Sequence, residues 1–245
     1  VTFSNGVTHS AAPHADHAPF LLESDIPTIV SRSTNEVWRW HATALNDHAF
    51  ASPVFIATNG PGIAYSILGE PQLPWTDSSI TNQNIWASAL DFLIGRVCEG
   101  MNQEMPILVK LTDFFFSRHG LAYETVNGAT KYLSGLSSGG CYFDYSRYLS
   151  TSSGNIVNCY DQAAGLSMSS RMLGIPSDII FMQPFGYINE THLIGRGTCN
   201  NPFYANSKYD SRMICPTNAP RRSGSGNHMF VSHSSGCFDS CAGPV

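Results

Sequence analysis

Three residues of this chain have the types and the order that a thiol-based acyl-transfer site needs. Cys159 comes first, His228 lies downstream of it, and Asp239 follows His228 by eleven residues. In such a site a thiolate attacks a carbonyl carbon, an imidazole takes the thiol proton and later delivers it to the leaving group, and a carboxylate fixes the imidazole tautomer. The sequence therefore indicates Cys159 as nucleophile, His228 as base and acid, and Asp239 as the orienting carboxylate.

The stretch after Cys159 has the pattern of a helix that begins at this cysteine. Gly174-Ile-Pro176 ends the pattern in the way that Gly and Pro end helices. Because the first N–H groups of a helix are unpaired and its dipole is positive there, a thiolate at this position is stabilised. The residues on one helical row are Tyr160, Ala164, Met168 and Met172.

An oxyanion also needs donors at this helix start. We expect the backbone N–H of Cys159 to be one of them, since acyl transfer passes through a tetrahedral oxyanion. One more donor is required, and Asn158, Tyr142 and Tyr145 are its possible sources.

The spacing of His228 and Asp239 predicts two neighbouring antiparallel strands. Directly opposed residues of a hairpin place the turn at their midpoint, here between His233 and Ser234, inside the turn-like segment Ser232–Gly236. Opposed residues point to the same face with β-carbons about 5 Å apart, so the two side chains can form a hydrogen bond.

The same geometry discriminates between candidates. His233 is expected in the turn, which favours His228 as the base. Asp161 shares the helix start with Cys159 and is expected to stabilise the first turn electrostatically, which favours Asp239 as the orienting carboxylate.

Together these segments are similar to a known type of enzyme. Cys159-Tyr-Asp-Gln-Ala-Ala164, Arg171-Met-Leu-Gly-Ile-Pro176, Asn227-His-Met-Phe-Val231 and Cys237-Phe-Asp239 follow one another between about residue 84 and the end of the chain. In this order they resemble the transglutaminase-like superfamily of papain-type cysteine enzymes. In that family a Cys at a helix start, a His opening a strand and an Asp on the next strand form the triad, which by resemblance falls on the three residues above.

The resemblance implies an α+β fold, in which a helix with the Cys at its N-terminus packs on an antiparallel sheet. The family includes protein cross-linking enzymes, deamidases, peptidases, and peptidoglycan or isopeptide hydrolases. The metal-binding loops of its calcium-dependent members are not recognisable in this sequence, so we expect neither a bound metal nor a cofactor.

The chain divides near residue 78. Short alternating segments separated by turn signals such as Asn59-Gly-Pro-Gly62 predict a β-rich N-terminal domain or extension over residues 1–78. Apolar residues at helical spacing within 86–97 and within 107–115 predict two amphipathic helices at the start of a catalytic core over residues 79–245.

The composition favours a folded, secreted protein. Its 245 residues are 42% hydrophobic, whereas only 13% are charged, below the roughly 25% usual for soluble domains. A net charge of -5 argues against nucleic acid or an anionic membrane as partner, because either needs clustered Lys and Arg. No apolar run has the length of a membrane span. One glycosylation sequon, Asn189-Glu-Thr191, agrees with secretion.

Cysteine usage points to the same compartment. The seven cysteines are odd in number, so at least one is unpaired, and Cys159 is the candidate. The other six allow up to three disulfides, among which Cys199 and Cys215 are placed to close a loop. If the segment between them is extended, Cys237 and Cys241 are too far apart to pair with each other. The six are Cys98, Cys141, Cys199, Cys215, Cys237 and Cys241.

The leading expectation is a secreted cysteine hydrolase or acyltransferase that acts on amide bonds of peptides, glutamine side chains or cell-wall cross-links. An alternative is a disulfide-stabilised binding or toxin-like module without activity. A third is a metal-dependent protein that binds zinc through His9, His14 and His17. The polar stretch 200–225 is either a substrate lid or a surface excursion. The sequence leaves the oligomeric state open.

Overall fold

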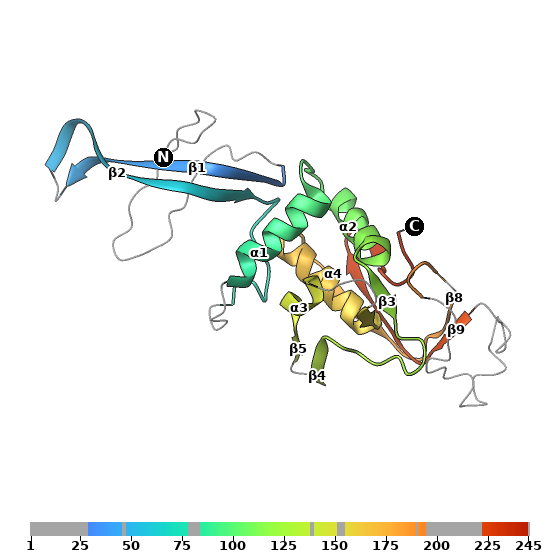
Figure 1. Ribbon diagram of the computed structural model, residues 1–245. Helices are drawn as coiled ribbons and strands as arrows, with labels where there is room; N and C mark the ends of the chain where they lie inside the picture. The colour runs from blue at the N-terminus through green and yellow to red at the C-terminus, as the bar shows by residue number, and fades with distance from the viewer. Residues whose placement is uncertain are drawn as a thin grey trace.

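The computed structural model describes residues 29–45, 48–77, 84–137, 140–150, 155–189, 191–194 and 222–244. The N-terminal histidines, Cys199, Cys215 and most of the stretch 200–225 lie outside these ranges. The described chain is a mixed α+β structure (Figure 1). Its elements are β1 (Ser31–Leu45), β2 (His48–Ser66), α1 (Asn84–Leu93), η1 (Ile94–Cys98), α2 (Glu104–Asp113), η2 (Phe114–Arg118), β3 (Leu121–Tyr123), β4 (Leu133–Ser137), β5 (Gly140–Phe143), α3 (Tyr145–Leu149), β6 (Asn155–Val157), α4 (Cys159–Met172), β7 (Asp178–Met182), β8 (Gly186–Asn189), β9 (Arg222–Ser225), β10 (His228–His233) and β11 (Gly236–Phe238).

The N-terminal part is a long two-stranded ribbon that extends away from the helices (Figure 1). The turn signal at 59–62 does not end a strand, because it lies inside β2. The pairing passes from Glu36↔Gly62 to Trp38↔Asn59, so β2 carries one extra residue there. A bulge accommodates the proline, which has no N–H to donate to the ladder.

The base of the ribbon is joined to the helical part. Val30 is fully buried, and its N–H donates to the carbonyl of Met101 at 2.6 Å. Arg32 forms an ion pair with Asp91 of α1 at 2.6 Å. The ribbon base therefore belongs to the same packed core as α1.

Helix α4 lies in the middle of the molecule, and eleven of its fourteen residues are buried (Figure 1). The predicted apolar row accounts for only part of this burial, since Ala164 and Met172 are buried whereas Tyr160 and Met168 are half-buried. Polar side chains fill much of the remaining buried surface, and they are satisfied by hydrogen bonds within the protein.

The two helices predicted after the ribbon are present as α1 and α2. Each continues into a turn of π-helix, η1 and η2 respectively. A three-stranded antiparallel sheet, in the order β11-β10-β7, packs with β10 against α4. β7 contains the apolar run 179–182, and β10 begins at His228, the residue that the resemblance places at the start of a strand. The other described strands pair two by two, as β3-β6, β4-β5 and β8-β9, of which only β3-β6 is parallel.

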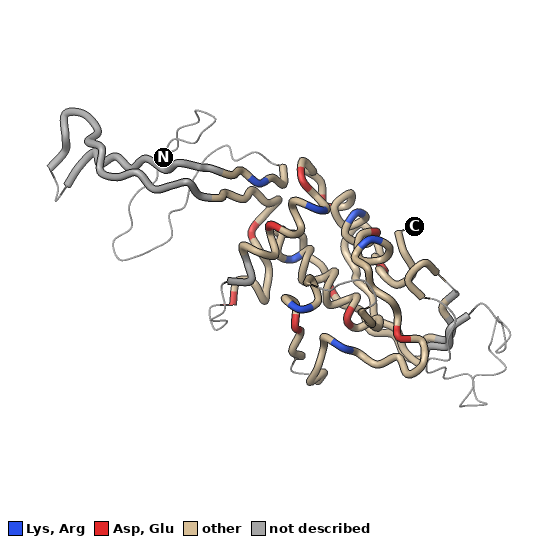
Figure 2. The backbone as a smooth tube through the Cα atoms, in the orientation of Figure 1, with Lys and Arg blue, Asp and Glu red and all other residues tan. Residues whose placement is uncertain are grey.

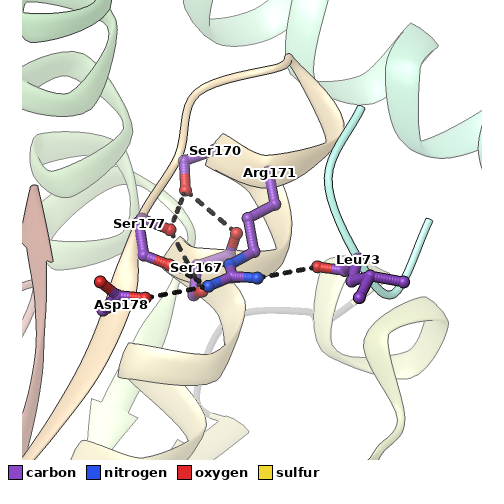
Figure 3. A network of polar contacts seen from close by, with 6 residues as sticks. All are labelled: Leu73, Ser167, Ser170, Arg171, Ser177 and Asp178. Carbon is purple, nitrogen blue, oxygen red and sulfur yellow. Dashed lines mark hydrogen bonds and ion pairs between the residues drawn. The ribbon is translucent and has the colours of Figure 1, made fainter. Parts of the chain in front are cut away.

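A polar network fixes the end of α4 against β7 (Figure 3). Arg171 Nε donates to the carbonyl of Ser177 at 2.7 Å, and its Nη1 donates to the carbonyl of Leu73 at 3.0 Å. The hydroxyls of Ser170 and Ser177 are hydrogen-bonded at 2.8 Å. The network therefore joins α4, the start of β7 and the segment that follows the ribbon.

Charged residues are few and spread along the described chain (Figure 2). Within the described ranges, no helix has both the length and the apolar character needed to cross a bilayer.

Candidate active site

Cys159 is the first residue of α4, and a capping box holds it there. The side-chain oxygen of Asn158 accepts the N–H of Asp161 at 3.1 Å, while the carboxylate of Asp161 accepts the N–H of Asn158 at 3.2 Å. Reciprocal bonds of this kind fix the start of a helix. Cys159 itself is 4% exposed.

The Asp161 carboxylate also builds the loop that surrounds the helix start. It is fully buried and accepts the N–H groups of Lys131, Tyr132 and Leu133 at 2.8, 2.9 and 3.0 Å. The hydroxyl of Thr130 donates to it at 2.6 Å. Asp161 therefore holds the loop of residues 130–133 against the first turn of α4. The sequence predicts only its electrostatic effect on that turn.

His228 and Asp239 are in direct contact. Nε2 of His228 lies 2.7 Å from Oδ2 of Asp239, and the imidazole is 1% exposed. His228 begins β10, the strand that packs against α4. The structure thus brings together the histidine and the aspartate that the sequence selected.

The predicted strand register is wrong by two residues. β10 and β11 pair Val231 with Phe238 and His233 with Gly236, so the two turn residues are 234 and 235. Continued by one pair, this register sets Asp239 opposite Phe230 rather than opposite His228. The two residues still face the same side, because the register differs by two residues and side chains alternate with a period of two.

The other imidazole nitrogen has no hydrogen-bond partner in the described chain. This nitrogen, Nδ1 of His228, is buried. Burial lowers the pKa of His228, but Asp239 and the neighbouring Cys159 thiol outweigh burial and raise the pKa to about 9. With Nε2 committed to Asp239, Nδ1 is the nitrogen available for the thiol proton. Such contacts are often loose in an empty site and tighten with substrate.

An aromatic ring fixes the plane of the imidazole. The ring of Phe185, which precedes β8, lies 4.5 Å from the ring of His228, centroid to centroid, at an interplanar angle of 30°. This contact and the bond to Asp239 together define the imidazole orientation.

The chain after β11 holds Asp239 in place. The N–H of Cys241 donates to Oδ1 of Asp239 at 2.8 Å. Gln162 of α4 donates through Nε2 to the carbonyl of Ser240 at 3.2 Å, and Thr191 donates to the carbonyl of Cys241 at 3.0 Å. Each oxygen of the Asp239 carboxylate therefore has a partner, and the segment that carries it is attached to α4.

Two tyrosines that the sequence analysis missed touch this site. The backbone N–H of Cys159 donates to the hydroxyl oxygen of Tyr123 at 3.2 Å, and the hydroxyl of Tyr160 donates to Oδ1 of Asn227 at 2.7 Å. Tyr123 belongs to β3, whose pairing with β6 brings it to Cys159 from 36 residues away. No local pattern marks such a residue.

The three donors expected from sequence have different surroundings. Tyr142 is 69% exposed on β5, and the buried hydroxyl of Tyr145 is hydrogen-bonded to Ser169 at 2.7 Å. Asn158 uses its oxygen for the helix cap and donates its amide to the carbonyl of Gly128 at 2.9 Å. The side chain of Asn158 therefore supports the start of α4, and that of Tyr145 is joined to α4 through Ser169.

All five described cysteines are free thiols: Cys98, Cys141, Cys159, Cys237 and Cys241. The three-disulfide arrangement allowed by the sequence is therefore absent, and Cys199 and Cys215 lie outside the described residues. Burial raises the pKa of Cys98 to about 12 and that of Cys241 well above its ordinary value. Neither thiol is suited to act as a nucleophile near neutral pH.

The described residues include no group of three or more His, Cys, Asp or Glu side chains that could hold a metal ion. The histidines proposed to bind zinc, His9, His14 and His17, are outside the described ranges.

Comparison with known proteins adds no family to this geometry. Neither a scan against protein-family models nor searches of curated proteins and of solved structures found a match to the chain. The case for a reactive site therefore rests on the hydrogen bond between His228 and Asp239 and on the effect of the neighbouring Cys159 on the pKa of His228.

Proposed function

We propose that this protein is a transglutaminase-like cysteine hydrolase or acyltransferase that acts on amide bonds through a thioester on Cys159. The observation that carries the proposal is the 2.7 Å contact between His228 Nε2 and Asp239 Oδ2, because it leaves the second imidazole nitrogen for the thiol at a helix start. The raised pKa of His228 supports an imidazolium at neutral pH, which is the form that can protonate a leaving amine.

In the first half of the reaction the sulfur of Cys159 forms a bond to the carbonyl carbon, and the carbonyl π electrons move to oxygen. When the oxyanion collapses, the bond from carbon to the amide nitrogen breaks. The imidazolium of His228 gives its Nδ1 proton to that nitrogen, and Asp239 stabilises the charged ring until then. The products are a thioester and an amine.

In the second half, water or a second amine attacks the thioester carbon. Neutral His228 takes the proton of the attacking group, and the carbon–sulfur bond breaks to restore the thiolate. Water gives hydrolysis, including deamidation of glutamine, and an amine gives transamidation.

A peptide or protein substrate fits the surroundings of the site. Strand β7 pairs Met182 with His228, and it carries exposed apolar side chains at Ile179, Phe181 and Met182. Exposed apolar groups beside a reactive residue suit a peptide chain better than a small polar amide. Secretion remains part of this proposal, on the basis of composition.

Alkylation by iodoacetamide tests whether the triad is active. We expect Cys159 to be alkylated faster than the exposed Cys141 of the same molecule, because the histidine stabilises the thiolate. His228→Ala should slow the alkylation of Cys159 and leave that of Cys141 unchanged, as read by peptide mapping against time. Cys141 serves as the internal control for reagent and pH.

The inactive binding module makes the opposite prediction. There Cys159 is no more reactive than an ordinary buried thiol, and His228→Ala has no effect on its alkylation rate. That result would exclude the proposed function.

A further inference from the structure

Backbone pairing between β3 and β6 holds Tyr123 beside Cys159. β3 and β6 are parallel, Tyr123 is paired with Val157, and the N–H of Glu124 donates to the carbonyl of Val157 at 2.8 Å. From Val157 the chain passes through Asn158 directly to Cys159. The strand that carries Tyr123 is thus fixed next to the strand that leads into α4.

The hydroxyl oxygen of Tyr123 occupies a specific position. It accepts the backbone N–H of Cys159 at 3.2 Å. In acyl transfer this N–H binds the oxygen that gains negative charge when the thiolate attacks. The phenol oxygen therefore stands where the oxyanion has to form.

We propose that Tyr123 is a catalytic residue that donates its hydroxyl hydrogen to this oxyanion, as the second donor beside the Cys159 N–H. The inference rests on the proposed function, since it concerns the same thioester chemistry. In the resting site the phenol oxygen satisfies the N–H. When a carbonyl enters, its oxygen takes the N–H, and the phenol turns its O–H toward that oxygen.

The required movement is small. An oxyanion about 2.9 Å from the nitrogen and about 2.7 Å from the phenol oxygen, at a tetrahedral angle, separates those two atoms by about 4.6 Å. The present separation is 3.2 Å, so the phenol has to withdraw by roughly 1.4 Å, the scale of a small side-chain rotation. The new hydrogen bond forms as charge develops, which is the condition for raising kcat.

Tyr123 neither gains nor loses a proton during the reaction. The sulfur–carbon bond forms, the carbonyl electron pair goes to oxygen, and the phenol keeps its proton while it donates the hydrogen bond. On collapse the electron pair returns from the oxygen and the leaving group departs, protonated by His228 if it is an amine.

The test compares two reactions of Cys159 in the full chain. Acylation by p-nitrophenyl acetate passes through an oxyanion, whereas alkylation by iodoacetamide displaces iodide without one. Tyr123→Phe should lower the rate of the acylation burst about 10²–10³-fold, with little change in KM and with alkylation within about two-fold of wild type. Tyr65→Phe is the matched control, because it removes a phenol hydroxyl bonded to Asp91 at the ribbon base.

Three results would overturn the inference. If Tyr123→Phe acylates as fast as wild type or faster, the hydroxyl is no donor, and the proposed function survives. If the variant slows acylation and alkylation equally, Tyr123 has only a structural role. If wild type shows neither a burst nor alkylation that depends on His228, the inference falls together with the proposed function.

Discussion

The hydroxyl of Tyr160 donates a 2.7 Å hydrogen bond to the side-chain oxygen of Asn227. Tyr160 directly follows the proposed nucleophile, and Asn227 directly precedes the proposed base. The bond therefore joins the first turn of α4 to the start of β10. Its effect is to set the separation of Cys159 and His228.

Tyr160→Phe should lower kcat about ten-fold and leave KM nearly unchanged, because a reacting pair that is less well aligned loses rate rather than affinity. Asn227→Ala should have a similar effect, and the double variant should be little worse than either single one. Burst kinetics with p-nitrophenyl acetate give kcat and KM for the wild type, the two single variants and the double variant. If the losses of kcat in the two single variants add up in the double variant, the two side chains do not act through their shared hydrogen bond.

The stability of the protein should depend on pH through His228. Its pKa is raised to about 9 in the folded protein, against about 6.5 in an unfolded chain. The folded state therefore binds more protons between these values, so this contribution to stability is complete below about pH 6.5 and is lost as the pH rises toward 9.

Asp239→Asn removes the carboxylate whose hydrogen bond and charge raise that pKa. The fall in melting temperature between pH 6.5 and 9 should then be shallower than in wild type, as measured by calorimetry at several pH values. Equal slopes for the two proteins would contradict the assigned role of Asp239.

Asp161→Ala should destabilise the fold by about 3 kcal/mol or more, because four backbone N–H groups, three of them buried, and the hydroxyl of Thr130 lose their acceptor. Asp178→Ala is the control, since that side chain is 84% exposed and its ion pair with Arg171 is 3.3 Å long. We expect the control to cost less than about 1 kcal/mol. Urea unfolding measures the free energy of unfolding of both variants. Similar losses in the two would contradict the role of Asp161 as the acceptor that holds this loop.

Gly174→Ala should disturb the turn between α4 and β7. Gly174 has φ of +83°, and a β-carbon there would lie 2.4 Å from the backbone carbonyl of Gly69. Gly100→Ala is a matched control, because Gly100 has φ of +79° and no atom within 4 Å of such a carbon. The control should cost about 1 kcal/mol, and Gly174→Ala at least about 2 kcal/mol more. Equal unfolding free energies would show that the close approach is relieved without cost.

Local patterns predicted the parts of the site that local forces determine. The start of α4 at Cys159, its end shortly before Gly174 and the strand that begins at His228 follow from capping and turn signals and from the hairpin spacing. The hydrogen bond between His228 and Asp239 also followed from a simple hairpin argument. That argument gave the correct face and an incorrect register, because the turn lies one residue further along than its midpoint estimate.

Contacts between segments distant in sequence could not be predicted from local patterns. Tyr123 reaches Cys159 through a parallel strand pair, and Gln162 reaches Ser240 across 78 residues. A parallel pairing has no turn that marks it in sequence. The long ribbon was missed for another reason, since a bulge allowed β2 to continue through residues with the pattern of a turn.

The central claim is that an acyl group passes through the sulfur of Cys159. Incubation with a panel of glutamine-containing and cell-wall-type peptides, acid quenching and peptide mapping by mass spectrometry would locate the intermediate. We predict an added acyl mass on the peptide that contains Cys159, with release of ammonia or an amine, and its absence in Cys159→Ala. Amide turnover that persists in Cys159→Ala would contradict the account.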